Sequence, residues 1–267
     1  MSLRETALDA GTPEARRLRL HVPAGRPPAQ GWPLLVLLDG NWVWPLDPLP
    51  ATCAVLIPGH GGMPGSEPHT LARRALDFTP PAPHGGLWPD PRQPEWQCGG
   101  ADAFLDALLG PMLDWAGTQT PLDPARRSLY GHSYGGLCAL YALVRHPGQF
   151  TQTFCASPSL WWHDGHLETL LSRLPAHRET PPPAADRWPV RLTLMAGTDE
   201  RWYARPADAA HPRRPEDGIP TLPRLAALCE RLAGISWLDC ALERLEGAQH
   251  GDALRAGALR AAALAAR

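Results

Sequence analysis

The 267-residue sequence predicts an α/β fold, a mostly parallel sheet with helices on both faces. Short strand-like runs alternate with longer amphipathic runs through most of the chain, as βαβ crossovers require. One early run, Pro33–Leu38, is apolar throughout, which is typical of a strand buried on both faces. Because single α/β domains of roughly 250 residues are common, we expect one domain spanning residues 1–267.

The strand-like runs occur at seven places in the chain. The first, Arg17–Val22, alternates polar and apolar residues, and we expect it to form an edge strand. The other six runs are short and mainly apolar: Pro33–Leu38, Ala54–Ile57, Ser128–Tyr130, Thr153–Ala156, Val190–Met195 and Trp237–Leu242.

Helical periodicity separates most of these strands. The expected helices are Ala101–Trp115, Leu137–Arg145, His166–Leu174, Leu222–Leu232 and Asp252–Ala266. Two stretches, Pro58–Gln97 and Trp202–Pro220, are rich in proline or glycine, and we expect long loops there. Loops that leave the carboxyl ends of parallel strands border the ligand crevice of such a sheet.

The composition excludes several classes of function. All 25 positively charged side chains are arginine, so mechanisms that need a lysine, such as a Walker A site or a Schiff base, are excluded. A net charge of −2 gives no electrostatic footprint for nucleic acid. No apolar run approaches the roughly 20 residues needed to cross a membrane.

The cellular location and cofactors follow from similar observations. Met1–Thr6 contains no apolar segment of a signal peptide, so we expect a cytoplasmic protein. None of the six cysteines forms a Cys-x-x-Cys pair, and we expect free, buried thiols. We find no metal-ligand spacing and expect no metal or cofactor; the sequence does not indicate an oligomeric state.

The most informative segment is Gly131-His132-Ser133-Tyr134-Gly135, a G-x-S-x-G pattern between a strand and a helix. A serine hydroxyl is a weak nucleophile unless a base reaches it and backbone amides stabilise the developing oxyanion. A tight strand-to-helix turn presents the hydroxyl in that way, and its glycines make room for the neighbouring backbones. Ser133 is therefore the predicted nucleophile.

An acid and a base should follow the nucleophile in chain order. Asp199 and Glu200 come directly after the Val190–Met195 run, and either could orient the base. His250 follows the last strand, just before the final helix, and is the predicted general base.

The oxyanion hole should combine two backbone amides. One is the amide of Tyr134, at the start of the helix after the nucleophile. The other is the amide of Gly40 or Asn41, after the first apolar strand. We expect the Asp39 carboxylate to stabilise this loop rather than to take part in catalysis, because a negative charge aimed at an oxyanion would oppose catalysis.

Four segments together resemble the putative-esterase family of α/β-hydrolases: Leu37–Asn41, Gly99–Leu105, Gly131–Leu137 and Ser157–Trp162. Within this family the nearest resemblance is to the siderophore esterases, which cleave enterobactin, salmochelin or bacillibactin. It extends over roughly Trp32 to Arg260, and it implies the α/β-hydrolase fold and a catalytic pair of Ser133 and His250. It also favours Glu200 over Asp199, although some members use a Ser–His dyad.

The resemblance also implies cationic and aromatic groups in the pocket, because siderophore trilactones carry catechol rings and an anionic ferric centre. Arg73 and Arg74 precede Asp77-Phe78-Thr79-Pro80, which is similar to a family segment, and would bind this small-molecule substrate. Trp161 and Trp162 could stack on the rings.

Two other interpretations remain open. A general carboxylesterase acting on small, feruloyl or acetyl esters, or on thioesters, would use the same catalytic residues. A hydrolase-fold binding protein without catalysis would need the nucleophile or the histidine to be lost, and both Ser133 and His250 are present.

Overall fold

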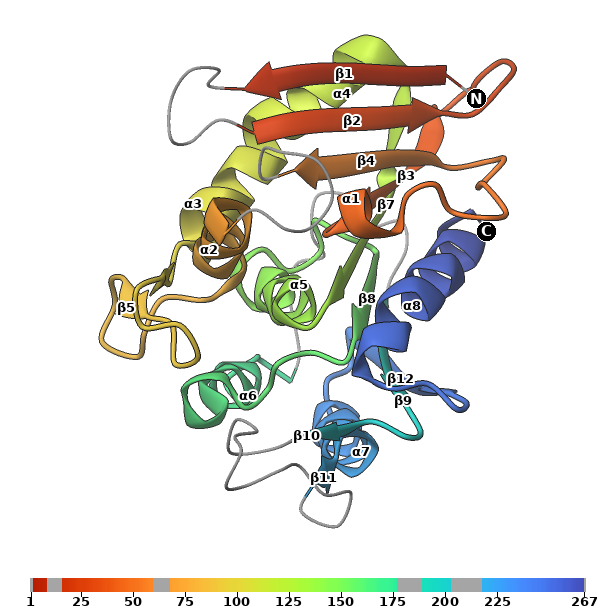
Figure 1. Ribbon diagram of the computed structural model, residues 1–267. Helices are drawn as coiled ribbons and strands as arrows, with labels where there is room; N and C mark the ends of the chain where they lie inside the picture. Colours follow the sequence, from red (N-terminus) through yellow and green to blue (C-terminus); the bar gives the residue numbers. More distant parts are fainter. Residues whose placement is uncertain (1, 9–15, 60–67, 177–188, 203–217, 267) are drawn as a thin grey trace.

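A computed structural model describes residues 2–8, 16–59, 68–176, 189–202 and 218–266 (Figure 1). Its centre is an eight-stranded sheet with the order β1-β2-β4-β3-β7-β8-β9-β12. The strands are β1 (Ser2–Leu8), β2 (Arg16–Val22), β3 (Trp32–Leu37), β4 (Ala54–Gly59), β7 (Leu122–His132), β8 (Gln152–Ala156), β9 (Val190–Gly197) and β12 (Leu238–Leu245). Strand β2 runs antiparallel to both of its neighbours, β1 and β4, and the other pairs of this sheet are parallel, so the predicted mostly parallel sheet is confirmed.

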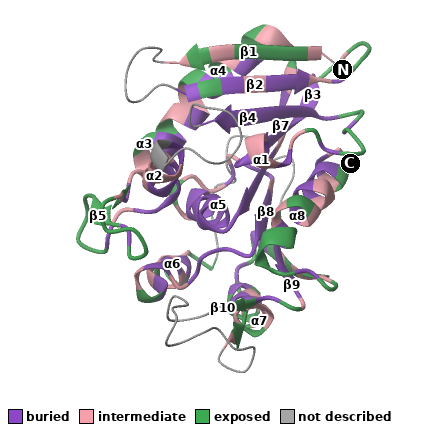
Figure 2. Cartoon of the chain, viewed as in Figure 1, coloured by how far each residue is buried: buried purple, intermediate pink, exposed green. Residues whose placement is uncertain are grey.

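Helices cover both faces of the sheet, as the sequence predicts. The longer helices are α2 (Pro68–Phe78), α5 (Tyr134–Arg145), α7 (Thr221–Leu232) and α8 (His250–Ala265), and the shorter ones are α1 (Gly40–Val43), α3 (Ala101–Ala107), α4 (Leu113–Gln119) and α6 (His166–Leu171). In Figure 1, α8 lies on the face opposite α5, and both helices pack on β7 and β8. Figure 2 shows that α5 is buried along nearly its whole length.

Strand β3 contributes side chains to the hydrophobic cores on both faces of the sheet. Its side chains alternate across the sheet, so Leu34 and Val36 join the core beneath α5, whereas Leu35 and Leu37 join the core beneath α8. All four side chains are fully buried. A strand that contributes to two cores must be apolar at every position, which accounts for the uniform run that predicts it.

Several elements differ from the sequence prediction. Strand β1 was not predicted because most of its side chains are exposed, and its pairing with β2 removes β2 from the edge of the sheet. The helix expected at Ala101–Trp115 is interrupted by a π-helical turn at Leu108–Met112, since Pro111 has no amide hydrogen to donate.

The two expected loops have different outcomes. Pro58–Gln97 contains α2, so it is only partly a loop. It also contains β5 (Trp88–Pro89), which pairs with β6 (Gln97–Cys98). Most of Trp202–Pro220 lies outside the described residues; at its ends, β10 (Arg201–Trp202) pairs with β11 (Ile219–Pro220).

The described residues also bear on membranes, thiols and metals. None of the helices within the described ranges has both the length and the apolar character needed to cross a membrane. All six cysteines are free, and four of them are buried: Cys53, Cys98, Cys138 and Cys155. In the same part of the chain, no cluster of three or more His, Cys, Asp or Glu side chains could hold a metal ion.

Candidate active site

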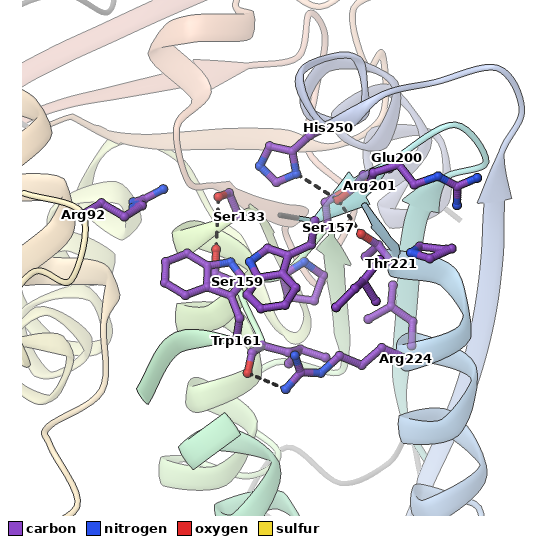
Figure 3. A pocket seen from close by; sticks show the side chains of 16 residues that line it. Arg92, Ser133, Ser157, Ser159, Trp161, Glu200, Arg201, Thr221, Arg224 and His250 are labelled. Atoms are coloured by element: carbon purple, nitrogen blue, oxygen red, sulfur yellow. Dashed lines mark hydrogen bonds and ion pairs between the residues drawn. The ribbon is translucent and has the colours of Figure 1, made fainter. Parts of the chain in front are cut away.

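The predicted catalytic residues lie at the carboxyl edge of the parallel sheet. Ser133 follows β7, Glu200 follows β9 and His250 follows β12. In a parallel sheet these strand ends lie along one edge, so residues far apart in sequence converge there. All three side chains line one pocket, shown in Figure 3.

Ser133 sits on a strained turn between β7 and α5. Its φ of 56° and ψ of −116° lie outside the regions that non-glycine residues normally adopt. A Cβ at Gly131 would come within 2.0 Å of the Gly135 carbonyl oxygen, so the turn can close only around glycine. The pattern Gly-x-Ser-x-Gly thus produces the strained serine geometry of a nucleophile elbow, with the Ser133 side chain lining the pocket.

His250 begins α8 and is held by a buried carboxylate. Its Nδ1 lies 2.9 Å from Glu200 Oε1, and Glu200 is only 4% exposed. Thr221 Oγ1 donates to the same oxygen at 3.0 Å, and Ser157 Oγ donates to Oε2. The side chain of Asp199 makes no such contact, because Asp199 is exposed while its backbone amide donates to the Ala248 carbonyl.

These hydrogen bonds determine the charge of the acid. Burial raises the pKa of Glu200, but the hydrogen bonds from His250 and Ser157 outweigh burial and lower the pKa below its ordinary value. Glu200 is therefore an anion at neutral pH. An anion bonded to Nδ1 keeps the proton on that nitrogen and leaves Nε2 as the basic nitrogen.

His132, next to the nucleophile, was not singled out by sequence reasoning. Its Nε2 lies 2.8 Å from the carbonyl oxygen of His250, and the two rings are 4.6 Å apart. Burial lowers the pKa of His132 to about 3, with smaller contributions from His250 and Arg74. The ring is therefore neutral at pH 7, and it donates Nε2–H to the base's own backbone. Only its position inside G-x-S-x-G could have drawn attention to it.

The pocket beside Ser133 has a volume of about 370 Å³ and is open to solvent on one side (Figure 3). Arg92 lies on its wall, with its guanidinium carbon 4.3 Å from the centre of the Tyr134 ring and 5.2 Å from that of Trp161. Half of the Arg92 side chain is exposed, and its nearest carboxylate, on Asp90, is 3.8 Å away. The pocket therefore presents a cation held between aromatic rings.

The predicted oxyanion residues lie at the starts of two helices, and they are not among the residues that line the pocket. Gly40 and Asn41 begin α1, and Tyr134 begins α5. The first amides of a helix have no partner within it, so they can face a ligand. Leu38 donates to the Tyr130 carbonyl at 3.0 Å, which places the end of β3 beside the end of β7.

Three residues predicted to bind substrate lie elsewhere. Arg74 is buried and makes two 2.7 Å bonds to the Asp39 carboxylate, with a third bond to the His132 carbonyl. Arg73 pairs with Asp77, one turn further along α2, and Trp162 is fully buried in the core. None of these three side chains lines the pocket, whereas Trp161 does.

Asp39 accordingly has the bracing role that the sequence indicates. Its carboxylate is 2% exposed and binds Arg74, which in turn contacts the strand end that carries the nucleophile. In this structure the family-like segment around Arg74 thus contacts the loop of Gly40 through Asp39. Sequence alone could not separate the two roles, because both require an arginine beside the site.

A model of the family described as "Putative esterase" matches residues 10–210. The chain belongs to this family. It is 31% identical over 194 residues to the siderophore triacetylfusarinine C esterase of Aspergillus fumigatus, an alignment that covers 67% of this chain and 59% of that protein. It is also 31% identical over 156 residues to the ferri-bacillibactin esterase of Bacillus subtilis, which covers 53% and 52% of the two chains.

The family fold is seen in a solved siderophore hydrolase, EstB, from Aspergillus nidulans. This structure superimposes with a TM-score of 0.73 over 97% of this chain and 92% of the other, at 23% identity. The α/β-hydrolase fold and the resemblance to the siderophore esterases are thus confirmed. The chain spans about half the length of the two curated esterases.

Proposed function

We propose that this protein is a serine esterase in which Ser133 is the nucleophile, His250 the general base and Glu200 the orienting acid. The decisive observation is the 2.9 Å bond between His250 Nδ1 and buried Glu200, in the same pocket as the strained Ser133. This combination of a nucleophile, a base and a group that orients the base characterises acyl-transfer hydrolases.

In this mechanism Ser133 Oγ attacks the ester carbonyl while His250 Nε2 accepts its proton. The negative oxygen of the tetrahedral intermediate would bind the amides of Tyr134 and of Gly40 or Asn41. His250 then protonates the departing alcohol, and an acyl group remains on Ser133. Water attacks this acyl-enzyme by the same route, which releases the carboxylic acid and restores the serine.

We propose further that the substrate is a catecholate siderophore ester. The relatives named above act on siderophores, and the pocket has the complementary chemistry: the Arg92 cation lies between the rings of Tyr134 and Trp161. A guanidinium suits both an anionic oxygen and the face of a catechol ring. The role assigned by sequence to Arg73 and Arg74 thus passes to Arg92.

The location we propose is the cytoplasm, because free cysteines are typical of reducing compartments. We also propose that residues 1–267 form one domain, since a single sheet includes strands from Ser2 to Leu245.

The test of function compares substrates. The protein should convert a catecholate trilactone, with or without iron, to its linear and monomeric acids, measured by mass spectrometry. A serine-directed organophosphonate should stop the reaction and modify the peptide that contains Ser133. Modification elsewhere would overturn the nucleophile assignment. Hydrolysis of p-nitrophenyl or feruloyl esters without trilactone hydrolysis would replace the siderophore proposal with a general carboxylesterase.

A further inference from the structure

The segment Ser157-Pro158-Ser159, directly after β8, touches both ends of the candidate triad. Ser157 Oγ donates to Glu200 Oε2. Two residues later, Ser159 Oγ lies 3.2 Å from Ser133 Oγ, and the Ser159 amide donates to the Ser133 carbonyl at 3.2 Å. In Figure 3 a dashed line joins Ser159 to Ser133, and Ser157 lies nearer to Glu200.

These contacts are enclosed by protein. Ser157 and Ser159 are at most 2% exposed, so water cannot easily replace either hydroxyl. Ser157 also has a φ of 45°, an unfavourable conformation for a serine, and its amide donates to the Met195 carbonyl at the end of β9. The strained backbone directs the Ser157 hydroxyl to the acid.

The hydrogen bonds around Glu200 divide its two oxygens between different partners. Oε1 accepts from His250 and Thr221, whereas Oε2 accepts from Ser157. Removal of the Ser157 hydroxyl would leave Oε2 without this donor in a buried site. The carboxylate could then turn about its last torsion or take up a proton, and either change weakens its hold on His250.

We propose that Ser157 is a positioning residue that keeps Glu200 ionised and fixed in the orientation that His250 requires. This proposal rests on the proposed esterase function and adds to it a residue that acts through the acid. Ser159, at the other end of the segment, holds the resting Ser133 hydroxyl. The nucleophile must turn from this position to reach the base, because no hydrogen bond joins Ser133 to His250 among the described residues.

The charged groups around Glu200 determine which ionisations affect the pH profile of kcat/KM. His250 lies on α8, His132 at the end of β7, and Arg201 and Arg224 on the pocket wall. The arginines stay charged, and His132 stays neutral above about pH 4 because burial lowers its pKa to about 3. A difference between variants in the acidic limb of kcat/KM therefore does not arise from His132 or the arginines, and it points to the ionisation of Glu200.

The experiment compares Ser157→Ala with Ser157→Gly, using a p-nitrophenyl ester between pH 4 and 9. Both variants lack the hydroxyl, but glycine relieves the positive φ, so the two should differ in stability and agree in kinetics. We expect both to lower kcat roughly 10- to 100-fold with little change in KM, as loss of a hydrogen bond to a charged group predicts. Both should shift the acidic limb, because the hydrogen bond from Ser157 is one of the contacts that lower the pKa of Glu200.

The control is Ser172→Ala, which removes an exposed hydroxyl bonded to the Thr169 carbonyl and should leave the profile unchanged. A second readout is the NMR signal of the His250 Nδ1 proton, which should shift in both Ser157 variants whether or not the protein hydrolyses esters. If the wild type is inactive but this signal shifts, the esterase proposal fails and the positioning role stands. Unchanged limbs and an unchanged signal would overturn the role of Ser157.

Discussion

The two sides of the pocket satisfy their polar groups in different ways. On the catalytic side, the side chain of Glu200 is almost fully buried and accepts hydrogen bonds from three neighbours. On the recognition side, the Arg92 side chain is half exposed and rests mainly on aromatic rings. Hydrogen bonds thus fix the candidate acid and base in place, whereas the Arg92 guanidinium on the proposed recognition side remains half exposed.

The two arginines beside Tyr134 show the same difference. The Arg74 guanidinium lies 5.9 Å from the centre of that ring and the Arg92 guanidinium 4.3 Å. Arg74 is buried and forms a bidentate pair with Asp39. It therefore supports the loop next to the candidate catalytic residues without lining the pocket. Burial and partners, rather than residue type or contact with an aromatic ring, distinguish the enclosed Arg74 from the half-exposed Arg92.

The largest effect should come from the catalytic side. Ser133→Ala removes the nucleophile, and kcat should fall roughly 10⁶-fold for every ester, as in other triad enzymes. Because alanine fits in place of serine, the circular dichroism spectrum should stay that of wild type. Hydrolysis of any substrate at more than a hundredth of the wild-type rate would show that another group performs the attack.

The next effect concerns the acid. Glu200→Gln should lower kcat about 10⁴-fold, because a neutral amide no longer favours the required tautomer of His250. Asp199→Asn is the matched control and should stay within about twofold, since Asp199 is exposed and its side chain does not reach His250. Steady-state kinetics with one neutral ester decides the matter. Near-normal turnover in Glu200→Gln would instead indicate a Ser133–His250 dyad.

Replacement of Arg74 should lower the stability of the protein more than it changes substrate recognition. Arg74→Met leaves the buried Asp39 carboxylate without its partner, and the free energy of unfolding should fall by about 3–5 kcal/mol. Arg73→Met should cost about 1 kcal/mol or less, because Arg73 is partly exposed and Asp77 keeps its bond to Arg16. Urea unfolding measures both. An Arg74→Met protein of normal stability that fails only on catecholates would restore the substrate role of Arg74.

The convergence of the candidate catalytic residues was largely predictable from sequence. Ser133, Glu200 and His250 each follow a strand of the parallel sheet, and the common direction of these strands brings such positions to one edge. The choice of Glu200 over Asp199 needed the three-dimensional structure, because adjacent residues at a strand end point in different directions. Only the packing of Ser157 and Thr221 around the carboxylate distinguishes them.

The recognition side was harder to predict because long-range packing determines it. Arg92 lies in an irregular loop, and nothing local indicates that it reaches the rings of Tyr134 and Trp161. Trp161 and Trp162 are adjacent, yet one lines the pocket and the other is fully buried. Helix α2 was missed for a related reason: the prolines and glycines of its surroundings obscured its periodicity.

The smallest effect should come from Arg92, and it should depend on the substrate. Arg92→Leu removes a cation from the pocket wall, so kcat/KM for an anionic catecholate ester should fall roughly 5- to 150-fold, which corresponds to about 1–3 kcal/mol of lost transition-state stabilisation. The same variant should hydrolyse p-nitrophenyl acetate normally, because that ester is small and neutral. For the catecholate ester, the kcat/KM of Arg92→Lys should lie between those of wild type and Arg92→Leu. An ammonium keeps the charge but lacks the planar face that stacks on Tyr134 and Trp161.

The control for net charge is Arg26→Leu, which removes an exposed arginine from a loop outside the pocket and should change neither substrate. Added salt should reduce the difference between wild type and Arg92→Leu, because Arg92 is half exposed and its charge is screened. An equal loss on both esters would mean that Arg92 supports the fold, as Arg74 does. No loss on the catecholate would mean that the recognition side binds an uncharged ligand, and the general carboxylesterase would then be the better assignment.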